Sequence, residues 1–233
     1  MKFSLIIPCY DEAANLTNLL ERCRGLTSTP GIEIVLVDNG STDGTPCALR
    51  ELLPSYPGCR SVRVENNQGY GFGILTGLAA ANGNLLGWTH ADMQTDPQDV
   101  LRGLELFAQH GENIFVKGRR YGRPLADVMF TVGMSIFETL LLTSPLWDVN
   151  AQPTMFSRKF YGNWGTAAPY DFSLDLYAYY CALRCGLAVY RFPVRFGERA
   201  HGKSHWNVNW AAKRKFIRRT VDFSLKLKKR VDT

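Results

Sequence analysis

Motif signatures of several common protein classes are absent from this chain of 233 residues. Its six cysteines form no CxxC pair and show no zinc-like spacing with the four histidines, so we expect packed, reduced thiols rather than a zinc site or a disulfide framework. No GxGxxG motif follows the first apolar run, which argues against a Rossmann dehydrogenase.

Long apolar runs and flexible linkers are also scarce. The run at residues 3–7 is shorter than the roughly 7–15 residues of a secretory signal, so we interpret it as a first strand. Residues 129–146 are apolar, but Glu138 and several Ser, Thr and Gly residues interrupt them, and they fall short of the roughly 18 uncharged residues of a membrane span. No linker rich in Pro, Gly or Ser divides the chain. We therefore predict one domain over residues 1–205 and a basic amphipathic segment over residues 206–233.

Positive charge is concentrated near the C-terminal end. The net charge is +6, and residues 213–230 hold nine Lys or Arg residues and one acid, Asp222. Apolar and aromatic residues are mixed with these cations, which suits a helix lying on an anionic membrane surface. The alternative is a helix whose apolar face packs on the domain.

Apolar, β-rich runs alternate with segments of helical periodicity over the first 120 residues. Leu16, Leu19 and Leu20, for example, have helical spacing, and Pro30 and Gly31 end that segment. This alternation predicts an α/β fold, with a doubly wound, mostly parallel sheet and flanking helices in a single domain. The predicted strands lie at residues 3–7, 32–37, 61–65, 85–88, 114–117, 154–156 and 187–194.

Acidic and polar side chains follow three of the predicted strands. They are Tyr10, Asp11 and Glu12 after the first strand, Asp38 and Asn39 after the second, and His90, Asp92 and Gln94 after the fourth. Open α/β sheets bind ligands at the carboxyl ends of their strands, so these side chains are expected to share one site. The pattern indicates a site for a sugar nucleotide and its metal. A nucleic-acid partner is not expected, because these acids would repel a phosphate backbone.

The segment after the fourth strand is a candidate metal site. His90, Asp92 and Gln94 alternate along an extended segment, so all three are expected to point the same way. Such a set suits a hard divalent cation, Mn²⁺ or Mg²⁺, that bridges a diphosphate and offsets the charge of the leaving group. In the alternative interpretation, Asp92 caps the helix that follows Pro97.

The turn after the second strand and the glycines after the third also allow two interpretations. We interpret Asp38 as a ligand of a ribose or of a base N–H group, and Asp43 as the cap of the following helix. The glycines of the segment 69–77 would let the backbone approach a phosphate group.

Two further groups are candidates for the acceptor side of such a site. Arg119, Arg120 and Arg123 follow the fifth predicted strand, where a guanidinium cluster favours phosphate recognition, with a solvated turn as the alternative. Asp171 and Asp175 open a predicted helix and are candidate general bases, with stabilisation of the helix dipole as the alternative.

Five segments, in the same order, resemble motifs of the family 2 glycosyltransferases of the GT-A fold, particularly those of the polyprenyl-phosphate type. SLIIPCYDEAANL resembles the opening IPxYNE element, VDNGSTDGT resembles VDDGSxDxT, and HADMQTDP resembles the metal motif DADLQxxP. NNQGYGFGILTG is similar to the family's glycine-rich stretch, and FPVRFGERAHGKSHW resembles VPVxFxxRxxGxSK. The similarity is dense over residues 3–97 and 191–205.

The resemblance implies inverting transfer of a sugar from a GDP- or UDP-linked donor to a polyprenyl phosphate, by a cytoplasmic enzyme peripheral on the membrane. A membrane partner protein is compatible with it. Asp92 and, from its place on the predicted helix, Asp175 are the candidate catalytic carboxylates. The implied ligands of Mn²⁺ or Mg²⁺ are His90, Asp92 and Gln94, and the candidate acceptor-binding residues are Arg119, Arg199 and Ser204. The implied nucleotide-binding residues are Pro8, Tyr10, Asp11, Glu12, Asp38, Asn39 and Gly69.

The chain departs from the family pattern at three positions. His90 replaces the first Asp of the metal motif, Asn39 replaces the second Asp of VDDGS, and His205 replaces the final Lys, which makes that charge pH-dependent. Two other functions stay open. One is transfer to a hydroxyl of a lipid-linked glycan or polysaccharide, with Asp171 or Asp175 as the base. The other is a non-catalytic module that binds nucleotide sugars or nucleic acid.

Overall fold

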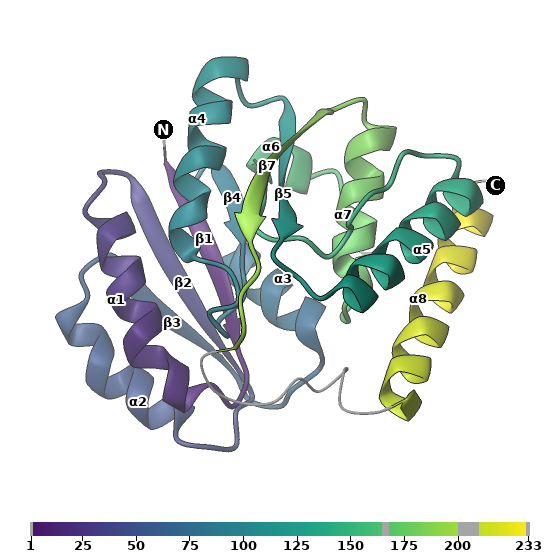
Figure 1. Ribbon diagram of the computed structural model, residues 1–233. Coiled ribbons are helices and arrows are strands. Elements are labelled where there is room, and N and C mark those ends of the chain that lie inside the picture. Colours follow the sequence, from purple (N-terminus) through teal and green to yellow (C-terminus); the bar gives the residue numbers. More distant parts are fainter. Residues whose placement is uncertain (1, 165–167, 200–209, 232–233) are drawn as a thin grey trace.

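The computed structural model describes residues 2–164, 168–199 and 210–231, and these form a seven-stranded sheet with helices on both faces (Figure 1). Neighbouring strands are parallel, except that the fifth strand in the order below is antiparallel to both of its neighbours. The predicted α/β, doubly wound and mostly parallel sheet is therefore confirmed. The strands lie in the order β3 (Cys59–Val64), β2 (Ile32–Asn39), β1 (Phe3–Cys9), β4 (Leu85–Trp88), β6 (Thr154–Ser157), β5 (Ile114–Tyr121) and β7 (Ala188–Arg195).

Proline residues stand close to the ends of some helices. α1 ends just before the predicted break at Pro30, and Pro124 directly precedes α5. The α-helices are α1 (Leu16–Thr27), α2 (Thr45–Leu52), α3 (Tyr70–Ala80), α4 (Val100–His110), α5 (Leu125–Leu142), α6 (Arg158–Tyr161), α7 (Ser173–Arg184) and α8 (Trp210–Val231).

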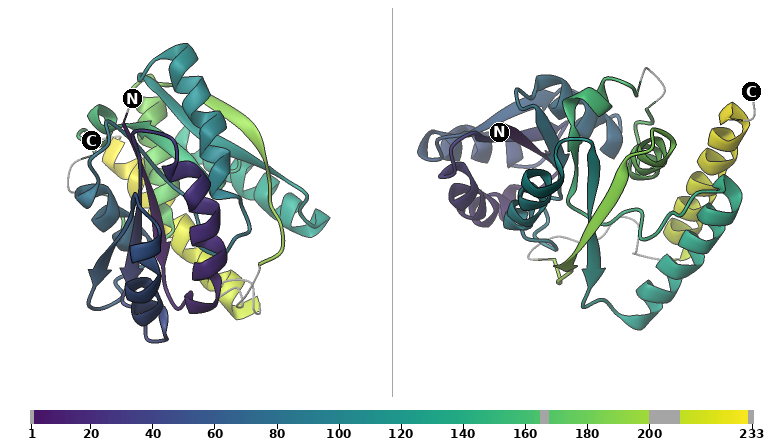
Figure 2. Two further views of the ribbon diagram at one scale, coloured as in Figure 1. Left: turned by 90° about the vertical axis from the view of Figure 1, so that its left-hand side faces the viewer. Right: turned by 90° about the horizontal axis from the view of Figure 1, so that it is seen from above.

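Both faces of the sheet are covered by helices, which explains why its central strands read as nearly continuous apolar runs (Figure 2). Successive side chains of β1 point to opposite faces of the sheet. Leu5 and Ile7 belong to the core shared with α1 and α4, whereas Ile6 belongs to the core shared with α3 and α7. With both faces buried, the carboxyl ends of the strands are the edge at which a site can form.

Two glycines of α3 bring this helix close to its protein neighbours. A Cβ atom at Gly77 would lie 2.5 Å from Cγ2 of Ile6, and one at Gly71 would lie 2.5 Å from the carbonyl oxygen of Pro169. The prediction that the whole segment lets the backbone approach a phosphate is therefore wrong at these two positions, because protein atoms fill the space that the missing side chains leave.

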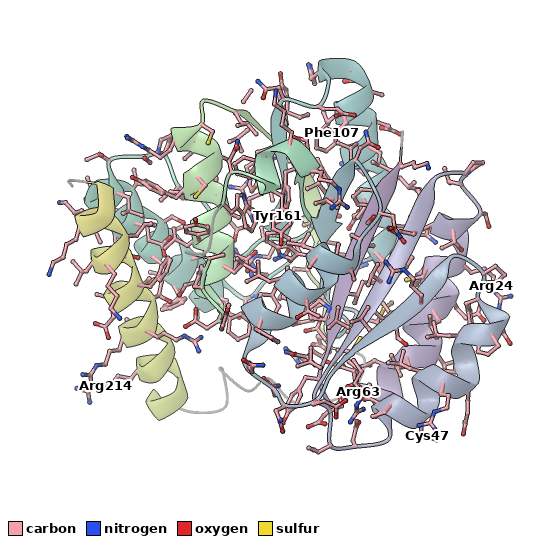
Figure 3. The ribbon with its side chains drawn as sticks, turned by 180° about the vertical axis from the view of Figure 1, so that it is seen from behind. Arg24, Cys47, Arg63, Phe107, Tyr161 and Arg214 are labelled. Carbon is pink, nitrogen blue, oxygen red and sulfur yellow. The ribbon has the colours of Figure 1, made fainter. Side chains whose placement is uncertain are left out.

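The helices α5 and α8 pack side by side at one end of the molecule (Figures 1 and 2). The exposed residues of α5 recur every three or four positions, and none is polar or charged. We call them the α5 stripe: Leu125, Ala126, Met129, Gly133, Ile136 and Leu140. The exposed residues of α8 are mostly cations, and Arg214 points away from the rest of the molecule in Figure 3.

By length and composition alone, α5 is able to cross a membrane, a test that core helices of soluble proteins also pass. This differs from the expectation for residues 129–146. The helix begins at Leu125, which adds apolar residues, and within it only Asp127 and Glu138 are charged.

Glu138 lies on the inner side of α5, where it is 4% exposed. Burial raises the pKa of its carboxyl group to about 7. The unfolded chain loses this proton near pH 4.3, while the folded protein keeps it until about pH 7, so the free energy of unfolding falls as pH rises through this window. Glu138→Gln is expected to remove that fall and to stabilise the protein at pH 8 by about 3 kcal/mol.

Urea denaturation of both proteins at pH 5 and pH 8 measures this effect. The variant should differ little from the parent at pH 5, where the folded carboxyl group is already neutral. An equally steep pH dependence in the two proteins would show that Glu138 ionises normally in the fold.

Candidate active site

A cavity of about 520 Å³ opens at the carboxyl ends of β1, β2 and β4, with residues of α5 and α7 on its other side. Its volume lies in the range of small-molecule sites. The three strand ends predicted from the sequence all contribute to it, together with segments from the second half of the chain. The lining residues include Pro8, Tyr10, Glu12, Asn39, Gly69, Tyr70, His90, Asp92, Gln94, Arg120, Arg123, Phe172, Asp175, Arg199 and Arg219.

The loop after β4 is joined to the segment after β7. Asp92 is 5% exposed, its Oδ1 accepts a hydrogen bond from the backbone N–H of Gln94 at 3.1 Å, and its Oδ2 lies 3.0 Å from Nη2 of Arg199. The side-chain amide of Gln94 donates to the carbonyl oxygen of Gly197 at 3.1 Å, and the N–H of Gly197 donates back to the carbonyl oxygen of Gln94 at 2.8 Å. Two motifs a hundred residues apart in sequence therefore form one wall of the cavity.

His90 lines the same wall in a neutral state. Its ring lies 5.7 Å from that of Tyr70, centroid to centroid. Burial lowers the pKa of its imidazole, and the nearby positive charges of Arg120 and Arg199 lower it too, against the carboxylates of Asp92 and Asp175. At neutral pH one ring nitrogen therefore has a free lone pair and is available as an acceptor or a ligand.

The described residues contain no cluster of three His, Cys, Asp or Glu side chains that forms a complete metal site by itself. Divalent cations that act with nucleotides, however, take one or two protein carboxylates and complete their shell with phosphate oxygens and water. Asp92 and His90 line one cavity with Glu12, whose carboxyl pKa is raised by burial and by the charge of Asp92. These residues fit a cation held jointly with a diphosphate, with Asp92 as its principal protein ligand.

The end of the cavity near β1 and β2 is lined by Pro8, Tyr10, Asn39 and Gly69. Asn39 is 3% exposed, and its side-chain amide donates to the carbonyl oxygen of Gly69 at 3.0 Å. Its Oδ1 has no partner among the described residues. Gly69 has a φ of 114°, and a Cβ atom there would lie 2.4 Å from the carbonyl oxygen of Tyr170. This end is partly aromatic and carries an unused hydrogen-bond acceptor.

Asp11 and Asp38, in contrast, do not line the cavity. Asp38 is 2% exposed and accepts hydrogen bonds from Arg63 Nη1 at 2.6 Å and from the N–H of Ser41 at 3.0 Å. Oδ1 of Asp11 accepts the N–H of Thr42 at 2.7 Å. Both carboxylates therefore brace the turn after β2, and Arg63 lies near the end of β3 in Figure 3. Asp43 accepts the N–H of Thr45 at the start of α2, although Gly44 and not the predicted Asp43 occupies the N-cap position.

The arginine wall is formed by Arg120 and Arg123, not by Arg119. Arg119 is exposed, whereas its neighbour Arg120 faces the cavity because successive side chains of β5 point in opposite directions. Buried Asp148 accepts hydrogen bonds from the backbone and guanidinium group of Arg120, and Arg123 and Arg191 lie within 3.9 Å of it. Burial opposes ionisation of Asp148, but Arg120 outweighs it and lowers the pKa of this carboxyl group. Three guanidinium groups around one carboxylate leave a net positive charge.

The two candidate bases occupy different places. Asp171 accepts the N–H of Ser173, the first residue of α7, at 2.8 Å, and it pairs with Nε of Arg219 at 3.3 Å. Asp175 is 1% exposed, and it lines the cavity as Asp171 does. Burial raises the pKa of its carboxyl group, against the lowering effect of Lys117. Both carboxylates therefore line the cavity, and the oxygens of Asp171 already pair with the N–H of Ser173 and with Arg219.

Sequence analysis missed Tyr70, Phe172 and Arg219 as lining residues. The rings of Tyr70 and Phe172 stack with centroids 4.5 Å apart, and Arg219 lies with its guanidinium carbon 5.5 Å from the Phe172 ring centroid. Tyr70 stands among the predicted glycines, but nothing in the sequence indicates that α7 and α8 meet there. Ser204 and His205 lie outside the described residues.

Acidic strand ends face an arginine wall across one cavity at the carboxyl edge of the doubly wound sheet, as expected for a glycosyltransferase of the GT-A fold. The family follows from sequence comparison: the family described as Glycosyl transferase family 2 matches residues 4–160, and the chain belongs to that family.

Individual relatives match a shorter part of the chain. It is 38% identical over 112 residues to undecaprenyl-phosphate 4-deoxy-4-formamido-L-arabinose transferase of Pseudomonas paraeruginosa, which covers 46% of this chain and 32% of that protein. It is 32% identical over 121 residues to dolichol-phosphate mannosyltransferase of Pyrococcus furiosus, which covers 52% and 34%. The chain thus spans about a third of the length of these curated relatives.

Solved structures match the fold over more of the chain. Glucosyl-3-phosphoglycerate synthase from Mycobacterium tuberculosis, in complex with Mn²⁺, UDP-glucose and phosphoglyceric acid, superposes with a TM-score of 0.71 at 19% identity, covering 97% of this chain and 79% of that one. A mannosyltransferase from Pyrobaculum calidifontis, in complex with GDP-Man and Mn²⁺, gives 0.62 at 20% identity, covering 87% and 58%. At these identities the likeness establishes the fold.

Proposed function

We propose that this protein transfers a sugar, with inversion, from a nucleoside-diphosphate sugar to a polyprenyl phosphate at the membrane surface. The observation that carries this proposal is the single cavity in which Asp92 and His90 face Arg120 and Arg123. One side suits a diphosphate with its cation, and the other suits a second phosphate group. Family membership and the polyprenyl-phosphate substrates in the relatives' names support the same assignment.

The donor is proposed to lie along the strand ends. Pro8, Tyr10, Asn39 and Gly69 would hold the nucleoside of a UDP- or GDP-linked sugar, with Oδ1 of Asn39 accepting an N–H or O–H group. Glu12 would lie between the nucleoside and the diphosphate. Asp11 and Asp38 are proposed to act on the nucleotide only indirectly, by fixing the turn against which it rests.

The diphosphate is proposed to lie beside the loop after β4. Asp92, His90 and Gln94 would hold Mn²⁺ or Mg²⁺ there, and the cation would supply Lewis acidity for the departing diphosphate. Arg199 forms an ion pair with Asp92, the residue proposed to bind the cation. The guanidinium group of Arg199 is also placed to contact a phosphate oxygen. Neutral His90 suits the borderline ion Mn²⁺ better than Mg²⁺, which prefers oxygen ligands.

The acceptor phosphate is proposed to bind the arginine wall. Arg120 and Arg123 offer a net positive surface, with Arg199 opposite and Ser204 on the segment that follows it. An acceptor oxygen held there attacks the anomeric carbon from the face opposite the diphosphate, so the new bond forms as the old one breaks and the configuration inverts. Arg119 is proposed to act outside the cavity, on the approaching headgroup.

The α5 stripe and the cations of α8 are proposed to lie on an anionic membrane, with the protein peripheral on its cytoplasmic side. An exposed helical face without a polar residue, beside a helix rich in Lys and Arg, has the composition of an interfacial surface. Asp127, Phe130 and Thr131 on another face of α5 line the cavity, so such docking would bring the cavity to the lipid. A membrane partner protein is compatible with this arrangement.

The runner-up function is transfer to a hydroxyl of a lipid-linked glycan. Its supporting observation is that Asp175 lines the cavity, since a hydroxyl acceptor needs a general base more than a phosphate does. A non-catalytic nucleotide-sugar or nucleic-acid module ranks third, because it has no need of a buried carboxylate beside two arginines.

Thermal stability with GDP, UDP, CDP and dTDP, each with and without Mn²⁺, tests the donor site. One nucleotide is expected to raise the melting temperature strongly and only with the cation, because a ligand that binds the folded state alone stabilises it. Transfer of labelled sugar from that nucleotide's sugar to undecaprenyl phosphate then tests the acceptor. Absence of any response to the four nucleotides would favour the non-catalytic module.

A further inference from the structure

Lys117 is a lysine in the interior of the sheet. It stands in the middle of β5, in the sequence IFVKG, and it is 0% exposed. Its Nζ donates to Oγ1 of Thr154 at 2.6 Å, directly across the antiparallel β5–β6 pair. A charged amine is rarely buried in this way unless a partner of opposite charge compensates for the loss of hydration. The cavity is not its partner, because Lys117 does not line it.

The charged partner of Lys117 is Asp175. Nζ of Lys117 lies 3.9 Å from Oδ1 of Asp175, and both side chains are at most 1% exposed. The same Oδ1 accepts hydrogen bonds from Trp88 Nε1 at 3.2 Å and from Gln152 Nε2 at 2.7 Å. All of these described contacts fall on one oxygen of the carboxylate, although Asp175 itself lines the cavity. The arrangement fixes one oxygen inside the protein and leaves the other for the ligand side.

Burial acts on both members of this pair. It lowers the pKa of the Lys117 amine and raises that of the Asp175 carboxyl group, and each charge opposes the effect of burial on the other. His90 and Tyr70 are the other titratable groups near Asp175, and Arg191, Asp148 and Arg120 are those near Lys117. Among these, only Lys117 forms a described ion pair with Asp175.

We propose that Lys117 is a positioning residue that keeps Asp175 ionised and turned, so that Oδ2 of Asp175 faces the cavity and accepts the proton of the acceptor's attacking O–H group. This rests on the proposed transfer. The acceptor oxygen forms the bond to the anomeric carbon, its proton passes to Asp175, and the nucleoside diphosphate leaves with the bonding electron pair. The attacking group is a hydroxyl, or a phosphate monoester that still holds one proton. Asp175 returns the proton to water after the products leave.

A double-mutant cycle tests this role. Lys117→Met and Asp175→Asn are each expected to lower kcat by about 10–100-fold, with the KM for the donor within roughly threefold of the parent. Because Lys117 acts through Asp175, the double variant should be no slower than Asp175→Asn alone. The matched control is Lys159→Met, which removes the same charge from an exposed position on α6 and should leave kcat unchanged. A double variant much slower than Asp175→Asn would overturn the proposal.

Infrared difference spectra give a readout that does not depend on transfer. At pH 7 the carboxyl group of Asp175 should be ionised in the parent. The parent and Asp175→Asn should therefore have the same spectrum in the region of protonated carboxyl groups. Lys117→Met should show a protonated-carboxyl band, and the double variant should lose it again. Absence of that band in a folded Lys117→Met protein would overturn the proposal, even if no acceptor has been found. If the parent protein transfers no sugar but Lys117→Met shows the band, the result would count against the proposed function alone.

Discussion

Asp92→Asn is expected to lower kcat for sugar transfer by about 10²–10³-fold, because an amide removes the negative charge that anchors both Arg199 and the divalent cation. The fold should tolerate the change, since Asn retains an oxygen for the N–H of Gln94. Mn²⁺ should no longer strengthen nucleotide binding in calorimetry. Transfer of labelled sugar to undecaprenyl phosphate measures the first effect.

Asp96→Asn is the matched control for this prediction. Asp96 stands in the same loop and caps the turn at Gln98, and Asn caps equally well. It does not line the cavity, so the same chemical change there should leave kcat unaltered. His90→Asp should act in the opposite sense and tighten Mg²⁺ binding by adding a carboxylate. Full activity of Asp92→Asn would remove this loop from the proposed mechanism.

Replacing Ile136 and Leu140 by Glu is expected to weaken binding to phosphatidylglycerol vesicles by at least about tenfold. Burying each apolar side chain in the membrane would contribute about 1.5–3 kcal/mol to the binding free energy. The anionic lipid would also repel the two new carboxylates. Both residues are exposed, at 52% and 74%, so the fold should not change. Sedimentation with vesicles measures the binding, and the nucleotide-induced shift in melting temperature checks the cavity.

The control for charge is a protein with Glu at Ala108 and Gln109, two exposed positions near the end of α4. It carries the same net charge as the α5 variant, so any difference between them reports the loss of apolar contact. Equal vesicle binding by the two variants would mean that α8 alone, or a protein partner, holds the molecule to the membrane. Self-association of the parent that is lost in the α5 variant would identify a second copy as the occupant of the α5 stripe.

The strands and the position of the site were predictable because apolar runs that end in polar residues have few other interpretations. The roles of single residues at those ends were harder to predict. Asp11 and Asp38 stand at the predicted place, but backbone N–H groups and Arg63 satisfy them, and a sequence does not reveal such local partners. The sequence does not show which of Arg119 and Arg120 faces the cavity, because side chains alternate along β5 and only the packed fold tells which face borders the site.

The far side of the cavity could not be predicted because it is assembled from distant segments. Asp175 and Lys117 are 58 positions apart and meet only because β5 and α7 pack together. Lys117 did carry a signal, since a lysine inside an apolar strand must either reach solvent or find a partner. The glycines of α3 misled for a related reason: a missing side chain makes room equally for a ligand or for another part of the protein.

The helix α5 lines the cavity with one face and carries the exposed α5 stripe on another. Its thickness therefore limits how far the reactive end of the acceptor can lie from the membrane. A helix with its side chains is about 10–12 Å across, so the cavity lies roughly that far from any surface on which the stripe rests. A phosphate attached directly to a lipid tail spans such a gap together with the first part of the tail. An acceptor that already carries several sugars would place its growing end beyond the cavity. The thickness of α5 would thus act as a ruler that admits short headgroups and excludes long ones.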